Sequence, residues 1–561
     1  MTHLHNSVEL EPSTASAPGD HLAAAWRRES MLVLLMLAPT LAAIWTVPWF
    51  TTQDGLAHLY NATILVDSLR GGPVFGDSYE VRWDPLPNWG GHLTLIGLLA
   101  IVPPRTADRI MTSLTLIGVA LAVAWLRRRT VSDAEPPSRI ATALAALSAL
   151  SFSWLMGFAS FQLGVCLFAV TLGVWWPYRD ELRPGRIAAL AGLLTIGYFC
   201  HLVSAGLTVF AMGFLAVSAP APDRTVFWRM RVRRLAVCFA PLTVLVLVYL
   251  RLAQRGGTMA PRFAKPGDLL TLSGWMGRIG WVDPVSFAVK NILPFTERAG
   301  AAFLAFSPLV WLTGAAVLLM LAAIWSRIGD GTHVGERRAW LGLSAALLAA
   351  GIFGPDSMGA GHGDYLPQRI TLLALVSAVP TIGPYSRSLL GRLGGGAIFV
   401  ALAMQAVSVW DYAVHAQKTV APITESAPQV GRGVRIAALL GDLRTRFRVN
   451  PVLHAPDWLG VVGGNVVWNN YETRHYYFPV QFKPGLVRPD SIQLEEIALA
   501  VPPRRQEGVS LWDGELSRAH DAVDVVVAWR SYPELDAVTA RWFEPAERLG
   551  DVTIWRRRDV R

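Results

Sequence analysis

The chain has 561 residues, of which 52% are hydrophobic and only 16% are charged, and its formal net charge is +9. A water-soluble chain would carry about 25% charged residues, so this composition and a mean hydropathy of +0.37 exclude a soluble globular protein. The positive charge does not indicate nucleic-acid binding, because the arginines gather in short runs between apolar stretches, as in the cytoplasmic loops of membrane proteins. The three cysteines lie within apolar stretches and predict neither a disulfide framework nor a zinc site.

Eleven apolar stretches divide the chain into three parts. Residues 1–30 are expected to form a disordered cytoplasmic tail, which Arg27 and Arg28 hold inside because they directly precede the first span, an uncleaved signal anchor. Residues 31–412 are expected to form an α-helical membrane module of about eleven transmembrane helices. Residues 413–561 are expected to form a soluble domain on the outer side of the membrane.

The arginine-rich loops set the predicted topology, with each of them in the cytoplasm. The turns near Gly157 and His201 contain no lysine or arginine and are expected to face outward. Residues 92–103 are too few to span a membrane, which takes about 20 residues, so we expect an interfacial helix within a first external loop of residues 50–106. Residues 187–218 are too few for two ordinary crossings, and we expect two short helices that meet near His201.

The pattern of residues 413–561 predicts alternating helices and strands without a spanning stretch. Residues 434–443 and 534–542 are predicted as helices, and residues 521–529 and 551–556 as strands. Together these elements predict a small α/β domain, which the topology places in the periplasm.

Two polar residues lie just outside the first span. Asp54 and His58 are four residues apart, so they share one face if this segment is helical. The carboxylate can act as a general base toward an acceptor hydroxyl, and with His58 it could hold a divalent cation, Mg²⁺ or Mn²⁺. Alternatively, Asp54 caps a helix that begins at Gly55, since aspartate is favoured at that position.

Residues 354–369 form a glycine-rich turn that contains His362 and Asp364 and ends in Arg369 at the start of the next span. Glycines let backbone amides approach an anion, and an arginine at the outer end of a span could hold a phosphate. The alternative is a flexible loop whose arginine reaches the membrane interface.

His201 is expected either to line a polar cavity open to the outside or to be hydrogen-bonded within the core. Because Asp54, His201 and Arg369 all fall at the outer ends of spans, we expect them to converge on one cavity. The residues expected to bind substrate there are His58, His201, His362, Asp364 and Arg369.

Two further segments have two interpretations each. Residues 251–300 combine basic residues with tryptophans, a composition that suits lipid phosphate headgroups or a solvated loop at the membrane surface. Residues 469–482 concentrate aromatic side chains around Glu472, Arg474 and His475. Such a segment suits sugar recognition, but we favour the core of the outer domain.

These features together resemble the GT-C superfamily of polyprenyl-phosphate-sugar-dependent membrane glycosyltransferases. The resemblance lies in the cytoplasmic N-terminus, the acidic residue that opens the first external loop, the interfacial helix there, the number of spans and the external C-terminal domain. Residues 157–164 (GFASFQLG) and 365–369 (YLPQR) look like stretches of uncharacterised bacterial membrane proteins of this kind. The resemblance implies that Asp54, the acidic residue of the first loop, is the catalytic base or assists a metal ion.

The function implied by the resemblance is sugar transfer from a polyprenyl-phosphate carrier to an acceptor on the outer face of the bacterial inner membrane. The expected partners are therefore the lipid-linked sugar and membrane lipid, and the acceptor is not identified. Two other classes stay open. A flippase of lipid-linked sugars would show inverted repeats, none of which is apparent, and a non-catalytic envelope assembly protein would tolerate the loss of Asp54.

Overall fold

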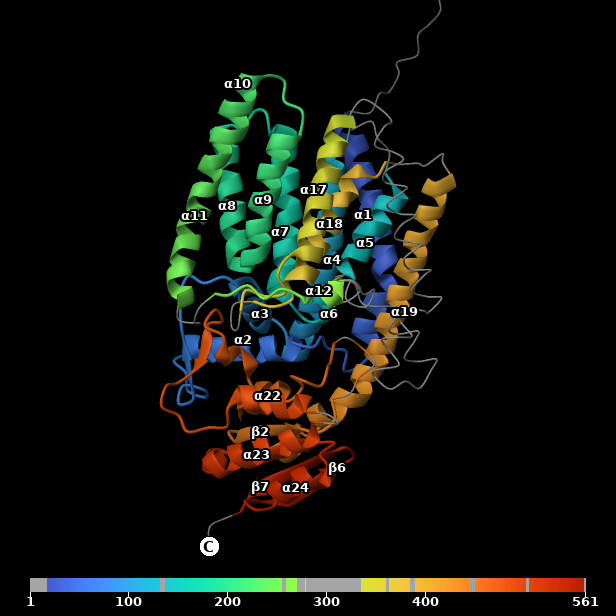
Figure 1. The fold of residues 1–561 in the computed structure, drawn as a ribbon. Coiled ribbons are helices and arrows are strands. Elements are labelled where there is room, and N and C mark those ends of the chain that lie inside the picture. The colour runs from blue at the N-terminus through green and yellow to red at the C-terminus, as the bar shows by residue number, and fades with distance from the viewer. Residues whose placement is uncertain are drawn as a thin grey trace, which may run out of the picture.

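The computed structural model describes residues 18–131, 137–254, 259–269, 278, 334–359, 363–383, 389–443, 445, 447, 449–500 and 504–558. His362 and most of the basic loop at residues 251–300 lie outside these residues. Figure 1 shows a bundle of long helices at one end of the molecule and a sheet with its covering helices at the other.

Five helical stretches of the described residues are long and apolar enough to cross a membrane, as expected for a multi-pass membrane protein. They coincide with most or all of α1 (Pro18–Thr46), α4 (Pro104–Thr130), α7 (Ala159–Trp175), α11 (Arg234–Ala253) and α19 (Leu389–Glu425). The other helices of the bundle are α5 (Arg139–Ala149), α8 (Pro184–Cys200), α9 (Leu202–Ser218), α17 (Val334–Phe353) and α18 (Leu366–Ala378). The predicted number of about eleven spans is not confirmed by this part of the chain.

Short helical turns connect the long helices. They are α6 (Phe152–Leu155), η1 (Trp176–Tyr178), α10 (Arg224–Val226), η2 (Phe227–Arg233), α12 (Pro266–Leu269), η4 (Val379–Thr381) and α20 (Ala427–Val430). In Figure 1, α10 marks the end of the bundle remote from the C-terminal domain. The arginines of α10 and η2 and the C-terminal domain therefore lie at opposite ends of the molecule. This arrangement is compatible with the predicted topology, whose direction stays a prediction.

Two short helices meet at His201, as the sequence predicted. Both α8 and α9 have 17 residues. His201 interrupts them because its backbone is extended, with φ −163° and ψ 123°. The turn thus places a histidine at an end of two paired helices.

The first loop lies across the end of the bundle, between the bundle and the C-terminal domain (Figure 1). It contains α2 (Gly55–Leu69), β1 (Tyr79–Val81) and α3 (Trp89–Leu99). The helix predicted at residues 92–103 is α3, which begins three residues earlier and has 11 residues. Residues 56–62 of α2 are buried without a break. A helix with one solvated face would show periodic burial, so α2 is covered on all sides.

The C-terminal domain contains a five-stranded sheet with the order β3-β2-β5-β7-β6. Its strands are β2 (Arg435–Leu440), β3 (Val466–Val467), β5 (Val525–Trp529), β6 (Phe543–Leu549) and β7 (Val552–Arg557). Strands β3, β2 and β5 are parallel, and β7 is antiparallel to both of its neighbours. The domain's helices are α21 (Asp457–Gly463), η5 (Tyr471–Arg474), α22 (Ser491–Leu499), α23 (Arg505–Ala519), η6 (His520–Ala522) and α24 (Pro533–Thr539).

One element of this domain was predicted wrongly. Residues 434–443 were predicted as a helix, but residues 435–440 form β2, an interior strand of the sheet. All but the first residue of β2 are buried. A strand buried on both faces of a sheet reads as a continuous apolar run, which periodicity cannot distinguish from a buried helix. The strands predicted near residues 525 and 552 and the helix predicted near residue 534 are confirmed.

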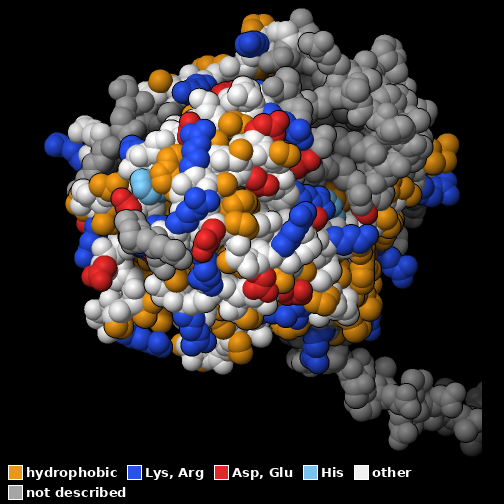
Figure 2. Space-filling view, turned by 90° about the horizontal axis from the view of Figure 1, so that it is seen from below, with side chains coloured by type: hydrophobic (Ala, Val, Ile, Leu, Met, Phe, Trp, Pro, Cys, Tyr) orange, Lys and Arg blue, Asp and Glu red, His pale blue; other side chains and the backbone are white. Residues whose placement is uncertain are grey.

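The face that the C-terminal domain presents outward mixes acidic and basic side chains (Figure 2). Several of these charges are paired, as in the ion pairs Arg530–Asp551 and Arg541–Asp513, both at 2.7 Å. Interspersed charges of both signs are typical of a surface in water.

A second, two-stranded sheet fastens the C-terminal domain to the first loop. In it β1 pairs antiparallel with β4 (Val480–Phe482), with Tyr79 opposite Phe482 and Val81 opposite Val480. One hydrophobic cluster also runs from α2 into the domain and includes Leu59, Trp468 and Val525. The first loop and the last part of the chain therefore share one core.

Candidate active site

A cavity of about 280 Å³ lies where the first loop, the ends of the bundle helices and the C-terminal domain meet. Among the residues that line it are Asp54, His58, His201, Asp364 and Arg369. The predicted convergence of Asp54, His201 and Arg369 on one cavity is therefore confirmed, while the roles of these residues stay predictions. The domain's segment at residues 469–482 supplies further lining residues: Tyr471, Arg474, His475, Tyr477 and Phe478.

Asp54 is held in place by its backbone. Its N–H donates to the carbonyl of Met156 at 2.9 Å, and the N–H of Gln53 donates to the carbonyl of Leu155 at 3.1 Å. Gly157 makes this contact possible: it has φ +88°, and a Cβ there would lie 3.1 Å from the Asp54 nitrogen. The turn between α6 and α7 thus fixes Asp54 at the cavity wall.

The side chain of Asp54 does not cap α2, so the capping alternative is wrong. Asp54 occupies the N-cap position, but its carboxylate accepts no hydrogen bond from the first turn of the helix. It accepts instead from the Tyr471 hydroxyl at 3.2 Å and from the side-chain amide of Gln53 at 3.3 Å. His454 Nε2 lies 3.6 Å from the same carboxylate.

Burial controls the ionisation of Asp54. The side chain is 5% exposed, and desolvation raises the pKa of its carboxyl group to about 6, although the charge of His58 and two hydrogen bonds oppose the rise. Burial likewise lowers the pKa of His454 to about 3, so this neighbour is neutral. A general base works best when its pKa lies near the working pH, and Asp54 satisfies that condition.

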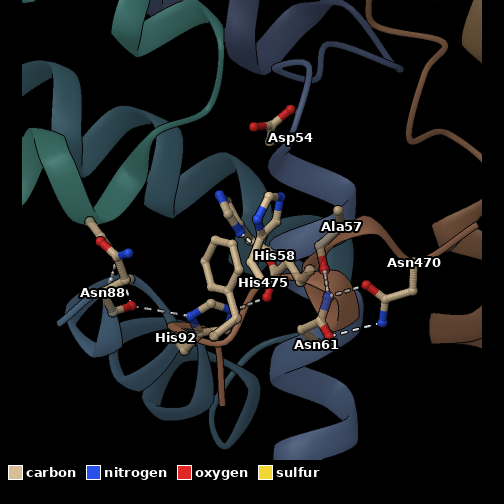
Figure 3. Close-up of polar contacts among 12 residues, drawn as sticks. Asp54, Ala57, His58, Asn61, Asn88, His92, Asn470 and His475 are labelled. Atoms are coloured by element: carbon tan, nitrogen blue, oxygen red, sulfur yellow. Dashed lines mark hydrogen bonds and ion pairs between the residues drawn. The ribbon is translucent and has the colours of Figure 1, made fainter. Parts of the chain in front are cut away.

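A second polar cluster lies beside Asp54 (Figure 3). Glu472 joins two histidines: His58 Nδ1 lies 2.5 Å from Oε1, and His92 Nε2 lies 2.9 Å from Oε2. Burial alone would raise the pKa of Glu472, but the two histidines outweigh it and lower the pKa to about 2. Burial would lower the pKa of His58, yet the Glu472 carboxylate holds it above its usual value. His58 thus pairs with Glu472 in the structure, and the role of Asp54 and His58 as cation ligands stays a prediction.

Arg369 brings a positive charge to the cavity wall. Its guanidinium lies over the rings of Phe158 and Phe161, at 4.7 and 5.5 Å from their centroids. Its Nε is buried and has no hydrogen-bond partner among the described residues. Aromatic rings satisfy the charge without using its N–H donors, so these donors stay available to an anion in the cavity. Asp364, by contrast, is exposed at the cavity rim.

His201 and Tyr365 complete this wall. The ring of His201 packs edge-on against Phe161 at 5.1 Å, and its Nδ1 has no hydrogen-bond partner among the described residues. Tyr365 has φ +58°, which is uncommon for a residue with a bulky side chain. Such backbone strain is concentrated at functional sites, and it occurs here in the residue before α18.

The sequence predictions missed His92 and Glu472. Residues 469–482 were favoured as domain core over a binding segment. In the structure Glu472 is fully buried, while its neighbours line the cavity. The available signal was a glutamate among aromatic side chains, because a buried carboxylate needs partners. Its partners, however, lie about 400 residues away in the sequence.

No family model matches the chain, and no curated protein matches it. The chain is similar to several solved structures, among them two of AftD and one of ArnT. The arabinofuranosyltransferase AftD from Mycobacteria matches 97% of this chain with 13% identity and a TM-score of 0.45, and its R1389S mutant matches 94% with 12% identity and a TM-score of 0.46. ArnT from Cupriavidus metallidurans, bound to undecaprenyl phosphate, matches 96% of this chain with 12% identity and a TM-score of 0.41.

The matches differ in how much of each structure they cover. They extend over 40% and 41% of the AftD chains, so the present chain spans less than half of AftD's length, and over 99% of ArnT. At these TM-scores the function of the chain has to be inferred from its cavity.

Proposed function

We propose that the chain is a membrane glycosyltransferase of the GT-C type, which transfers a sugar from a polyprenyl-phosphate carrier to an acceptor hydroxyl. One observation carries the proposal. A buried carboxylate with a pKa near neutrality, Asp54, and an arginine with unused donors, Arg369, line the same cavity. The first is suited to accept a proton and the second to hold a phosphate.

The proposed reaction begins when Asp54 accepts the proton of the acceptor hydroxyl. The acceptor oxygen attacks the anomeric carbon, and the bond from that carbon to the phosphate oxygen breaks. The polyprenyl phosphate leaves with the electron pair, and Arg369 stabilises the charge that develops on it. Asp54 then returns its proton to water. The sugar is already activated by its bond to the carrier phosphate, so the site needs no nucleotide.

The size and position of the cavity suit the head group of such a carrier. Small-molecule sites commonly have volumes of about 300–1,000 Å³, and the cavity has about 280 Å³. It can therefore enclose a sugar and a phosphate but not a long prenyl chain. Because the cavity lies at the end of the helical bundle, the chain of the carrier can stay in the lipid beside the helices.

The decisive experiment compares Asp54→Asn with wild type in purified protein in lipid, using a panel of radiolabelled undecaprenyl-phosphate sugars. We expect the variant to bind undecaprenyl phosphate as wild type does but to transfer sugar about 10²–10⁴-fold more slowly. Asp77→Asn is the matched control, since Asp77 belongs to the same loop, is exposed and does not line the cavity.

Equal transfer by Asp54→Asn and wild type would remove Asp54 as the base. Passage of the labelled sugar across the bilayer while it is still attached to its carrier would indicate a flippase instead. Failure of every labelled sugar to be transferred or moved would favour an assembly protein.

A further inference from the structure

Three residues from separate parts of the chain bring their donor atoms together beside the cavity. His58 lies in α2, His92 in α3 and Glu472 in η5. One ring nitrogen of each histidine and one carboxylate oxygen lie within 4.8 Å of one another. Glu472 is fully buried, His92 is 1% exposed and His58 is 9% exposed. Only His58 of the three lines the cavity.

The other side of each histidine is occupied by the backbone. His92 Nδ1 lies 3.4 Å from the carbonyl oxygen of Asn88, and the ring of His58 has a backbone hydrogen-bond partner at Gly157. A carbonyl oxygen can only accept, so the nitrogen that faces it must carry the proton. In a neutral ring the nitrogen that faces Glu472 is then a bare lone pair. Histidine ligands of metal ions show this arrangement, with the second ring N–H donated to a carbonyl or carboxylate.

The spacing of the three donors also suits a metal ion. A divalent cation can bind all three donors at about 2.0–2.2 Å, and donors within 4.8 Å of one another need only small shifts to reach it.

We propose that His58, His92 and Glu472 bind a divalent transition-metal ion of the Zn²⁺ class. Two imidazoles and one carboxylate form a common ligand set for zinc, whereas Mg²⁺ prefers oxygen ligands alone. The ligand set therefore favours zinc over the Mg²⁺ or Mn²⁺ expected from the sequence, and it does not include Asp54. The metal would tie α2 and α3 to η5 of the C-terminal domain, and it would fix His58 at the cavity wall.

The site can be tested without any assay of transfer, so its failure is separate from failure of the proposed enzyme. Full-length protein without a polyhistidine tag is purified, treated with a chelator, dialysed and titrated with Co²⁺. We expect one Co²⁺ per chain with a visible ligand-field band. His92→Asn and Glu472→Gln should lower Co²⁺ affinity at least about 100-fold. Loss of a residue that only orients a ligand lowers metal affinity by up to about 100-fold, and loss of a ligand itself should cost no less.

His520→Asn is the matched control, because it also removes one histidine but lies in η6, away from the cluster. Its Co²⁺ affinity should equal that of wild type. If the two ligand variants fail to fold, wild-type protein loaded with Cu²⁺ decides the question by electron spin-echo envelope modulation, which should show two coordinated imidazoles. Absence of Co²⁺ uptake by wild type, unchanged affinity in His92→Asn, or fewer than two imidazoles on Cu²⁺ would each overturn the proposal.

Discussion

At the scale of single residues, the most informative group is Asp54. Its carboxylate has lost most of its water, keeps two weak hydrogen-bond donors and has a neutral histidine nearby. Its protonation is therefore set by burial rather than by a strong partner. This makes the residue sensitive to pH near 6, where a carboxylate with an ordinary pKa stays charged.

The expected pH dependence follows from the pKa of about 6 for Asp54. We expect the rate of transfer to rise about tenfold per unit of pH below that value and to level off above it, because only the ionised form accepts a proton. The measurement is a pH–rate profile of wild type, with Asp54→Asn as the control that has no such rise. A flat profile across pH 6 would show that the ionisation of Asp54 does not limit the reaction.

The raised pKa of Asp54 also affects the stability of the fold, which should fall as the pH rises. The pKa of Asp54 is higher in the folded protein than the ordinary value of 3.8. Its contribution to stability is therefore complete below pH 3.8 and is lost as the pH rises through 6. The loss is of the order of 3 kcal/mol. Thermal unfolding of Asp54→Asn should lack this part of the pH dependence.

Part of the site could be predicted from single residues. Asp54, His201 and Arg369 each adjoin an apolar stretch, so the topology alone brought them to one side of the membrane. Glu472 and His92 could not be predicted in this way, because their relation depends on the pairing of β1 with β4, which no local pattern encodes.

At the scale of elements, the turn between α6 and α7 controls the start of α2. Gly157 has a positive φ, and a Cβ there would lie 2.6 Å from Thr52 Oγ1 and 3.0 Å from the Gly55 nitrogen. The two segments can approach this closely only because one of them has no side chain at the contact.

Gly157→Ala should therefore destabilise the protein by about 1–3 kcal/mol through backbone strain and should slow transfer by displacing Asp54. Thermal unfolding and the transfer assay measure the two effects. Gly213→Ala is the matched control: Gly213 lies within α9 with open space around its Cα. There the added methyl group should raise stability by up to about 1 kcal/mol. Equal behaviour of the two variants would contradict the role assigned to this turn.

Elements were predicted well where burial is one-sided or where a polar residue interrupts an apolar stretch. The break at His201 and the short helix α3 are examples. The prediction of β2 was wrong because both faces of the strand are buried, so its sequence has no alternation of apolar and polar residues. Membrane helices carry the same ambiguity, since an apolar stretch does not by itself show whether it spans.

At the scale of the whole molecule, the open question is direction across the membrane. The arginine-rich end of the bundle and the C-terminal domain lie at opposite ends (Figure 1). Because positive loops stay in the cytoplasm, we expect alkaline phosphatase fused after Arg561 of the full chain to be active in the periplasm. A reporter that works only in the cytoplasm should be inactive at that position and active when fused before Met1. The reverse pattern would invert the topology and would place the cavity on the cytoplasmic face.

The pairing of β1 with β4 also has a consequence for biogenesis. One wall of the cavity is made by residues 471–478, which are synthesised after all the candidate membrane spans of the described residues. The bundle alone therefore has no complete site, and a nascent chain gains one only after residues 471–478 have docked on the first loop. Contacts between residues this far apart in sequence form late. The proposed transfer of sugar from a lipid carrier therefore has to wait until this docking is complete.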